Sequence, residues 1–241
     1  MLNILKLELK KVKLPNLLGI VLVIPLLANI FGLVNYLNNR AMLSHGWKSL
    51  WTQVSLFYFS FFIIPLIALV VATLWAPEHK AGLDLIRTSP VRNKRFIAAK
   101  SLLALAVVAA TQLYFLLCFY LGGKFVCRFG AFDLSIFYYY IALSTLFSLP
   151  FIAIFTAVAV RIRSLGVVTL LSTLASFLGF LSSAQDIVPL FGKASGLSFL
   201  ALQMNRFERL APPEVLPLVA FALLEIVLFY AYAVRRLRYD A

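Results

Sequence analysis

The chain has 241 residues, of which 63% are hydrophobic and 13% are charged, and its mean hydropathy is +0.96. About 25% of the residues in an ordinary soluble domain are charged, and a water-soluble fold of this size could not hide so much apolar surface. These values exclude a soluble protein and predict an all-α integral membrane protein partly covered by lipid. The length suits a single transmembrane domain over residues 1–241.

The basic residues do not indicate a nucleic-acid-binding surface, although the net charge is +13. They lie in short clusters between long apolar runs, which is the distribution that the positive-inside rule produces. The two cysteines, Cys118 and Cys127, match no metal-ligand or redox spacing. We therefore expect membrane lipids, and no nucleic acid, as partners of this chain.

The first element, over residues 1–15, is predicted to be an amphipathic helix that lies in the membrane interface. Four apolar side chains fall on one stripe at helical spacing, and lysines line the edge of that stripe. The apolar positions are Leu2, Leu5, Leu9 and Val12. The alternative interpretation is a solvated basic tail.

Six apolar stretches are long enough to cross the hydrocarbon core, which needs about 20 residues. Pro65 and Pro150 fall inside the second and fourth stretches and are expected to kink them. The fifth is rich in small polar residues, so we expect it to face other helices. The six predicted spans cover residues 17–37, 54–76, 101–121, 135–160, 165–184 and 214–234.

The connections between the spans predict the orientation in the membrane. Fifteen of the 22 lysine and arginine residues lie on the side that holds both termini. This excess predicts that both termini are cytoplasmic. Trp47 and Trp51 before span 2, and Trp75 at its end, are expected at the membrane–water interfaces.

Two connections are too long to be simple turns. One is the cytoplasmic loop over residues 77–100, and the other is the outer segment over residues 185–213. The outer segment contains apolar pieces at 187–191 and 197–202. We expect these pieces to fold back onto the bundle as short helices, because long structureless loops are uncommon.

Motifs for catalysis are missing from the sequence. There is no G-x-x-x-x-G-K-[ST] loop for nucleotide phosphates and no G-x-S-x-G nucleophile motif. The two histidines, His45 and His79, are predicted on opposite sides of the membrane, which excludes a paired-histidine zinc site. We expect no catalytic residue, cofactor or metal on this chain.

Glu225 is the only ionisable residue deep in a predicted span. A carboxylate in hydrocarbon is costly, so it is expected to be protonated or paired, and such residues often mark ion or proton paths. The alternative is a neutral acid that hydrogen-bonds to a neighbouring helix. The sequence leaves both interpretations open.

The loop at 77–100 is the most informative stretch. Leu83 and Ile86 can form the apolar edge of a short helix among charges, and Pro90 disfavours helix at the residue before it. Such a helix, which lies between the ends of two spans, is suited to bind in a cleft of a soluble partner protein. The alternative is a positive-inside loop without a partner.

The same stretch resembles the coupling-helix region of type-2 ABC transporter permeases. The matching residues are Glu78, Gly82, Ser89 to Arg92, Ile97 and Lys100. The layout is also similar, with an interfacial N-terminal helix, six spans and a long outer segment before the last span. The chain length and the segment Glu8 to Lys11 further resemble the permeases of lantibiotic immunity systems.

The resemblance implies a permease subunit of an ATP-driven exporter in a bacterial cell membrane. A separate ATPase subunit, which binds ATP and Mg²⁺, would dock on residues 80–90, and a second permease, identical or related, would complete the transporter. Spans 2 and 5 would line the central path of an amphipathic peptide, lipid or drug. The docking residues would be Glu78, Gly82, Leu83, Ile86, Arg87, Ser89 and Pro90.

A second class of function remains open from the residues alone. Glu225 could serve an ion- or proton-coupled secondary carrier, and a membrane enzyme or a scaffold subunit are further possibilities. Carriers usually show inverted repeats and interrupted helices, and neither is evident here.

Overall fold

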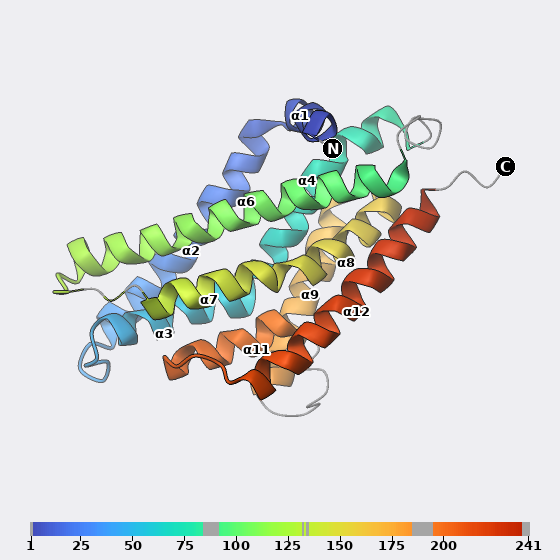
Figure 1. Cartoon of the computed structure of the whole chain (residues 1–241). Coiled ribbons are helices and arrows are strands. Elements are labelled where there is room, and N and C mark those ends of the chain that lie inside the picture. The colour runs from blue at the N-terminus through green and yellow to red at the C-terminus, as the bar shows by residue number, and fades with distance from the viewer. Residues whose placement is uncertain (1, 84–91, 132, 134, 185–194, 238–241) are drawn as a thin grey trace.

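A computed structural model describes residues 2–83, 92–131, 133, 135–184 and 195–237. The regular structure within these ranges is helical, without strands (Figure 1). Six stretches of it are long and apolar enough to cross a membrane. The predicted all-α membrane fold with six spans is therefore confirmed, while its orientation in the membrane stays a prediction.

The six spans follow the predicted order, and five of them extend beyond the predicted apolar cores, whereas α9 has its predicted bounds. In particular, α4 continues to Ala81 and α6 begins at Asn93, so the connection between these helices covers only residues 82–92 of the predicted loop. The spans are α2 (Leu14–Asn38), α3 with α4 (Trp47–Phe57, Ile63–Ala81), α6 (Asn93–Leu121), α7 with α8 (Ser135–Leu146, Ser148–Arg161), α9 (Leu165–Ala184) and α12 (Pro212–Arg236).

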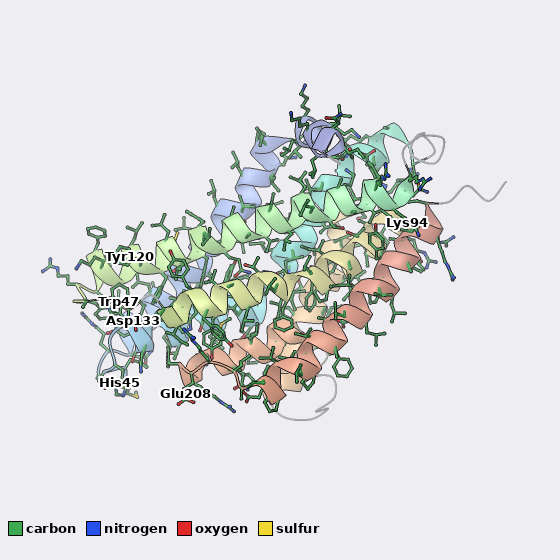
Figure 2. The ribbon with its side chains drawn as sticks, viewed as in Figure 1. His45, Trp47, Lys94, Tyr120, Asp133 and Glu208 are labelled. Carbon is green, nitrogen blue, oxygen red and sulfur yellow. The ribbon has the colours of Figure 1, made fainter. Side chains whose placement is uncertain are left out.

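The bundle has two ends that differ in charge. We call the end with the starts of α2, α6 and α9 and the ends of α4, α8 and α12 the basic end, because most lysines and arginines lie there. Figure 2 labels Lys94 at this end and His45, Trp47 and Glu208 at the opposite end.

Helix α1 (Leu2–Lys11) lies beside α6 at the basic end (Figure 1). Its buried face differs from the predicted stripe. Leu5 and Val12 do pack against the core, but Leu9 is 55% exposed and Glu8 is buried. Helix α1 therefore packs on the bundle through Glu8, whose buried partners the helical pattern alone does not reveal, while the contact of its apolar stripe with the membrane interface stays a prediction.

Span 2 is interrupted by the π-helical segment η1 (Tyr58–Phe62) between α3 and α4. Pro65 has no N–H, so it cannot bond to the carbonyl of Phe61 as an ordinary helical residue would. The Ser176 hydroxyl of α9 donates instead to the carbonyls of Ser60, at 2.8 Å, and Phe61, at 3.1 Å. The prediction that span 5 faces other helices through its small polar residues is confirmed.

The predicted kink in span 4 lies between α7 and α8, at Phe147. Pro150 cannot donate to the carbonyl of Leu146, and α7 ends at that residue. The Ser148 hydroxyl donates to the carbonyl of Ser144 at 2.7 Å, which ties the two halves together.

The segment before the last span also forms a helix. Helix α11 (Gly196–Gln203) packs against α9, α7 and η1 and continues into η3 (Met204–Arg206). This confirms the short helix predicted around 197–202. The other apolar piece, 187–191, lies outside the described residues.

Span 2 is the most enclosed of the spans, and α12 is the most exposed. In their most apolar windows, 67% of the residues of α3–α4 are buried, against 6% for α12, which packs mainly on α8. Trp51 and Trp75 are fully buried. Both rings pack against neighbouring helices and do not face lipid, while their predicted position at the membrane–water interfaces stays a prediction.

Candidate functional site

Four charged side chains from three helices meet at the basic end, next to the connection at 82–92. We call Glu8 and Lys11 of α1, Glu78 of α4 and Lys100 of α6 the four-charge cluster. The Lys100 Nζ lies 2.6 Å from Glu8 Oε2 and 3.1 Å from Glu78 Oε1. The Lys11 Nζ lies 2.8 Å from Glu8 Oε1 and 3.0 Å from Glu78 Oε1. The four groups form a closed ring without net charge.

Lys100 is the buried centre of this ring, with 2% of its side chain exposed. Besides the two carboxylates, its ammonium donates to the backbone carbonyl of Leu74 at 2.7 Å. All three of its donors are therefore used. The rings of Trp75 and Phe96 lie 5.5 Å and 5.1 Å from the nitrogen, so aromatic faces complete its surroundings.

The burial of the cluster makes its charge balance important. Glu8, Glu78 and Lys100 are each 5% exposed or less. Removing one partner of a buried ion pair destabilises the folded protein by about 3–5 kcal/mol, because the other charge stays buried without a partner. The cluster therefore holds α1, α4 and α6 together as one unit at this end of the bundle.

Lys11 connects the cluster to the surface, with 42% of its side chain exposed. Burial alone would lower the pKa of Lys11, but hydrogen bonds and attraction from Glu8 and Glu78 outweigh it and raise that pKa above 10.5. Lys11 is thus charged at neutral pH. The contribution of Lys11 to the stability of the fold is complete below pH 10.5. It is lost as the pH rises through the higher pKa that Lys11 has in the folded protein.

Local sequence explains how the cluster is placed. Glu8 and Lys11 are three residues apart, so they share one face of α1. Gly82 has φ = +87°, which favours glycine, and it ends α4 about one turn after Glu78. Lys100 lies two turns into α6, whose first residue, Asn93, donates from its amide to the carbonyl of Leu237 at 2.7 Å.

The predicted docking residues are only partly described. Glu78 belongs to the four-charge cluster, and Gly82 terminates α4. Leu83 is half-buried and packs against the core of its own chain. The others, Ile86, Arg87, Ser89 and Pro90, lie outside the described residues. Docking on this stretch stays a prediction.

Glu225 lies in the middle of α12, far along the chain from the four-charge cluster, and it is half-buried. It makes no hydrogen bond or ion pair with any other described residue. The structure therefore supports neither of the two roles that the sequence leaves open. Metal binding has no support either, since no three His, Cys, Asp or Glu side chains gather within the described ranges.

The apolar pattern of residues 1–15 does not predict the contribution of α1 to this site. The sequence does contain a signal for it, because Glu8 is the single acid among four lysines in residues 1–14. It also follows Leu5 by three residues and precedes Val12 by four, which is the spacing of one helix face. An isolated acid on the apolar face of a basic helix indicates a buried basic partner.

The profile of the ABC-2 family transporter proteins matches residues 4–185 of the chain. That range includes the whole four-charge cluster and the first five spans. The chain belongs to the ABC-2 family. No curated protein matches it. The predicted resemblance to type-2 ABC transporter permeases is confirmed, and this ABC-2 protein is a permease subunit of an ABC transporter. Helix α12, with Glu225, lies beyond the matched range.

Proposed function

We propose that this ABC-2 permease exports an amphipathic substrate, driven by a separate ATPase subunit that docks on the connection at 82–92. A second permease subunit, identical or related, would complete the transporter. The observation that carries the proposal is the four-charge cluster. Glu78 and Lys100 belong to the two helices that border the connection, and both bond to α1. A force on the connection would therefore move α1, α4 and α6 together.

The contacts of α4 support transmission from this cluster into the bundle. Helix α4 packs against α2, α6, α8 and α9. The adjoining η1 segment accepts the hydrogen bonds from Ser176 of α9. By resemblance, spans 2 and 5 line the central path, so displacement of α4 would reach the substrate. The charge-neutral cluster would act as the coupling between ATPase and path.

The composition of the spans supports an amphipathic substrate. Away from the ends of the described spans, Glu225 is the only Asp, Glu, Lys, Arg or His residue. A path without a series of charged side chains does not favour ions, whereas peptides, lipids and drugs with large apolar parts suit it. A lantibiotic-type peptide is the narrower proposal, and it rests on the chain length and the segment Glu8 to Lys11.

The proposal requires the basic end to face the cytoplasm, which cysteine labelling tests. The two native cysteines, Cys118 and Cys127, are first replaced by serine. In intact bacterial cells, a membrane-impermeant maleimide should then label Lys48→Cys but not Arg236→Cys. Labelling of Arg236→Cys should appear only after the membrane is opened. The reverse pattern would contradict both the orientation and the cytoplasmic ATPase dock.

The ATPase dock is tested by making its predicted apolar edge acidic. Each buried aliphatic side chain contributes about 1.5–3 kcal/mol, so Leu83→Asp with Ile86→Asp should release the ATPase during purification, although normal amounts reach the membrane. Arg87→Ala should weaken retention less and in a salt-dependent way, as expected for a charge at the rim. Met42→Asp, at an 82% exposed position near the opposite end, is the control. Retention of the ATPase by the double variant would rule out this dock.

The coupling role of the cluster needs a variant that frees α1 but keeps charges balanced. Glu8→Gln with Lys11→Gln breaks the ion pairs that α1 makes among the described residues and leaves the neutral Glu78–Lys100 pair. The ATPase should still co-purify, but substrate should no longer stimulate ATP hydrolysis. Lys6→Gln with Lys10→Gln, both exposed on the same helix, should behave like the unchanged protein. Normal stimulation in the first variant would leave the cluster with a structural role only.

A further inference from the structure

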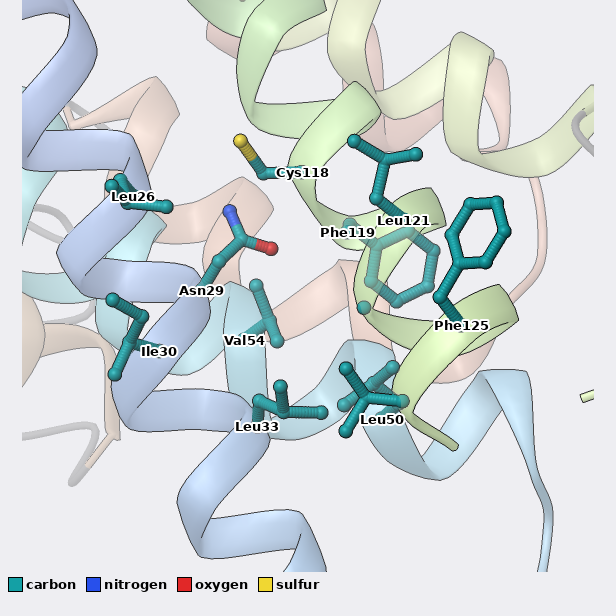
Figure 3. Close-up of a pocket in the computed structure, with 12 residues that line it drawn as sticks. Leu26, Asn29, Ile30, Leu33, Leu50, Val54, Cys118, Phe119, Leu121 and Phe125 are labelled. Atoms are coloured by element: carbon teal, nitrogen blue, oxygen red, sulfur yellow. The ribbon is translucent and has the colours of Figure 1, made fainter. Parts of the chain in front are cut away.

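A cavity of about 370 Å³ lies between α2, α3 and the end of α6, where the π-helical segment η2 (Gly122–Val126) begins (Figure 3). Most of its wall is apolar. Pockets that hold small molecules have volumes of about 300–1,000 Å³, so a stretch of hydrocarbon chain fits in this one. The lining includes Leu26, Ile30, Leu33, Leu50, Leu121 and Phe125.

The rim of the cavity belongs to the surface of the bundle and lies within two spans. Leu26 and Ile30 of α2 and Phe125 of η2 are all exposed. Both α2 and the stretch Asn93–Val126 are long and apolar enough to cross the membrane. Hydrocarbon rather than water therefore covers the rim, and an occupant of the cavity comes from the bilayer.

One amide, that of Asn29, contributes to the wall, and this residue is only 7% exposed. Its nitrogen donates to the carbonyl of Pro25 at 2.9 Å and to that of Phe115 at 3.4 Å. Since carbonyls only accept, these two bonds decide which amide atom is the nitrogen. Figure 3 shows the oxygen directed towards Phe119 and the cavity. No described residue donates a hydrogen bond to that oxygen.

The depth of Asn29 limits what can pair with this oxygen. Asn29 precedes the end of α2, at Asn38, by about 14 Å along the helix axis, at 1.5 Å per residue. This places the oxygen at the level of acyl chains and below the headgroups. An acceptor that borders a hydrocarbon-filled cavity without a donor costs free energy, which a donor on the occupant would recover.

We propose that the cavity binds the hydrocarbon chain of a membrane amphiphile, and that Asn29 accepts a hydrogen bond from a hydroxyl or amide N–H carried within that chain. The apolar wall fits the chain, the rim opens to lipid, and the amide oxygen selects chains that have a donor at this depth. The site is separate from the four-charge cluster. It does not depend on the ATPase, so it can be tested on the purified permease alone.

Trp51 is a suitable reporter for the occupant. It is fully buried, and its ring centroid lies 5.1 Å from that of Phe119, which lines the cavity. The partly exposed Trp47 is replaced by phenylalanine, and the permease is placed in phosphatidylcholine vesicles whose acyl chains are brominated at mid-chain. Bromine quenches tryptophan fluorescence only at short range. A chain inside the cavity should therefore produce saturable quenching that bulk lipid cannot.

A leucine in place of Gly122 should block the cavity. A Cβ atom there would meet only the Leu33 side chain, at 3.8 Å, which is an ordinary contact. Gly122→Leu should therefore lose the saturable quenching. Gly19→Leu, where a Cβ meets no atom within 4 Å, should keep it. Quenching that persists in Gly122→Leu would overturn the proposal. So would a lack of quenching in the Trp47→Phe protein, as expected if side chains of a second copy fill the cavity.

Competition tests the role of Asn29 without blocking the cavity. A stearate that carries a mid-chain hydroxyl should relieve the quenching at a lower mole fraction than stearate itself. This difference should disappear in Asn29→Leu, because that variant has no acceptor. Equal displacement by the two competitors in the unchanged cavity would overturn the assignment of Asn29 as the acceptor.

Discussion

The two ends of this permease are held together by different kinds of contact. At the basic end, four charges from α1, α4 and α6 form one ring around Lys100. Towards the opposite end, aromatic rings from several helices fill the core. The rings of Tyr58 and Phe115 stack with their centroids 4.0 Å apart, and the centroids of the Trp51 and Phe137 rings are 4.8 Å apart.

This contrast indicates how each end responds to a disturbance. A buried ring of charges depends on every member, so the loss of one group unbalances all of it. Aromatic packing is a sum of many small attractions, and no single pair dominates. The basic end is therefore sensitive to the loss of a single group, whereas the opposite end tolerates such a loss better.

The largest expected effect breaks the charged end. Lys100→Met leaves two buried carboxylates beside a single lysine, which should destabilise the protein by about 3–5 kcal/mol. The thermal unfolding midpoint in detergent should drop strongly, and Lys94→Met, an exposed position on the same helix, should not change it. Adding Glu78→Gln to Lys100→Met restores neutrality and should recover most of the loss. If the double variant does not recover stability, the loss in Lys100→Met comes from lost packing and not from the unbalanced charge.

The next effect tests the close packing of the opposite half. A Cβ at Gly32 of α2 would lie 2.4 Å from the Cα of Val54 in α3, so the two backbones would have to separate. Gly32→Ala should therefore lower the free energy of unfolding by about 1–3 kcal/mol. A lower thermal unfolding midpoint would show this loss. Gly19→Ala, on the same helix in open surroundings, is the matched control. Equal midpoints for the two variants would show that the opposite end is looser than its packing indicates.

A smaller effect is expected where the two halves meet, at η1. Ser176→Ala removes the hydrogen bonds to the carbonyls of Ser60 and Phe61. Such bonds between membrane helices contribute about 0.6 kcal/mol on average and at most about 1.7. Thr173→Val is the control, since that hydroxyl bonds within its own helix, to Thr169. The unfolding midpoint of Ser176→Ala should fall below that of the control.

The smallest expected effect is that of Glu225→Gln. Glutamine keeps the shape of the side chain and can still donate and accept hydrogen bonds. A permease that is driven by a separate ATPase does not need this acid to exchange protons, so transport should be unchanged. Loss of transport at normal expression would mean that proton exchange at Glu225 contributes to the cycle.

The architecture could be predicted from the sequence to a large extent. Long apolar runs set the spans, and Pro65 and Pro150 follow the interruptions in spans 2 and 4, because each lacks the N–H group that a regular helix needs. The small polar face of α9 also predicted contact with other helices. The longer reach of α4 and α6 could not be foreseen, because the last turn of α4 and the first turns of α6 contain charged residues that resemble a loop.

The site itself could be predicted only in part. Glu78 and Lys100 were recognised through their place in a family motif, but Glu8 and Lys11 were not connected to them. That connection depends on how α1 lies across α4 and α6, which no pattern within α1 records. The cavity beside Asn29 has the same origin, since it exists only through the spacing between α2, α3 and α6.

The four-charge cluster also has a consequence for biosynthesis. The ribosome makes Glu8 first and Lys100 last, roughly 5–20 s later at about 5–20 residues per second. Until the third span enters the membrane, Lys11 is the only basic partner of Glu8 within the cluster, and the ring around Lys100 cannot close. Helix α1, although made before the spans, therefore waits for the third span before it docks fully.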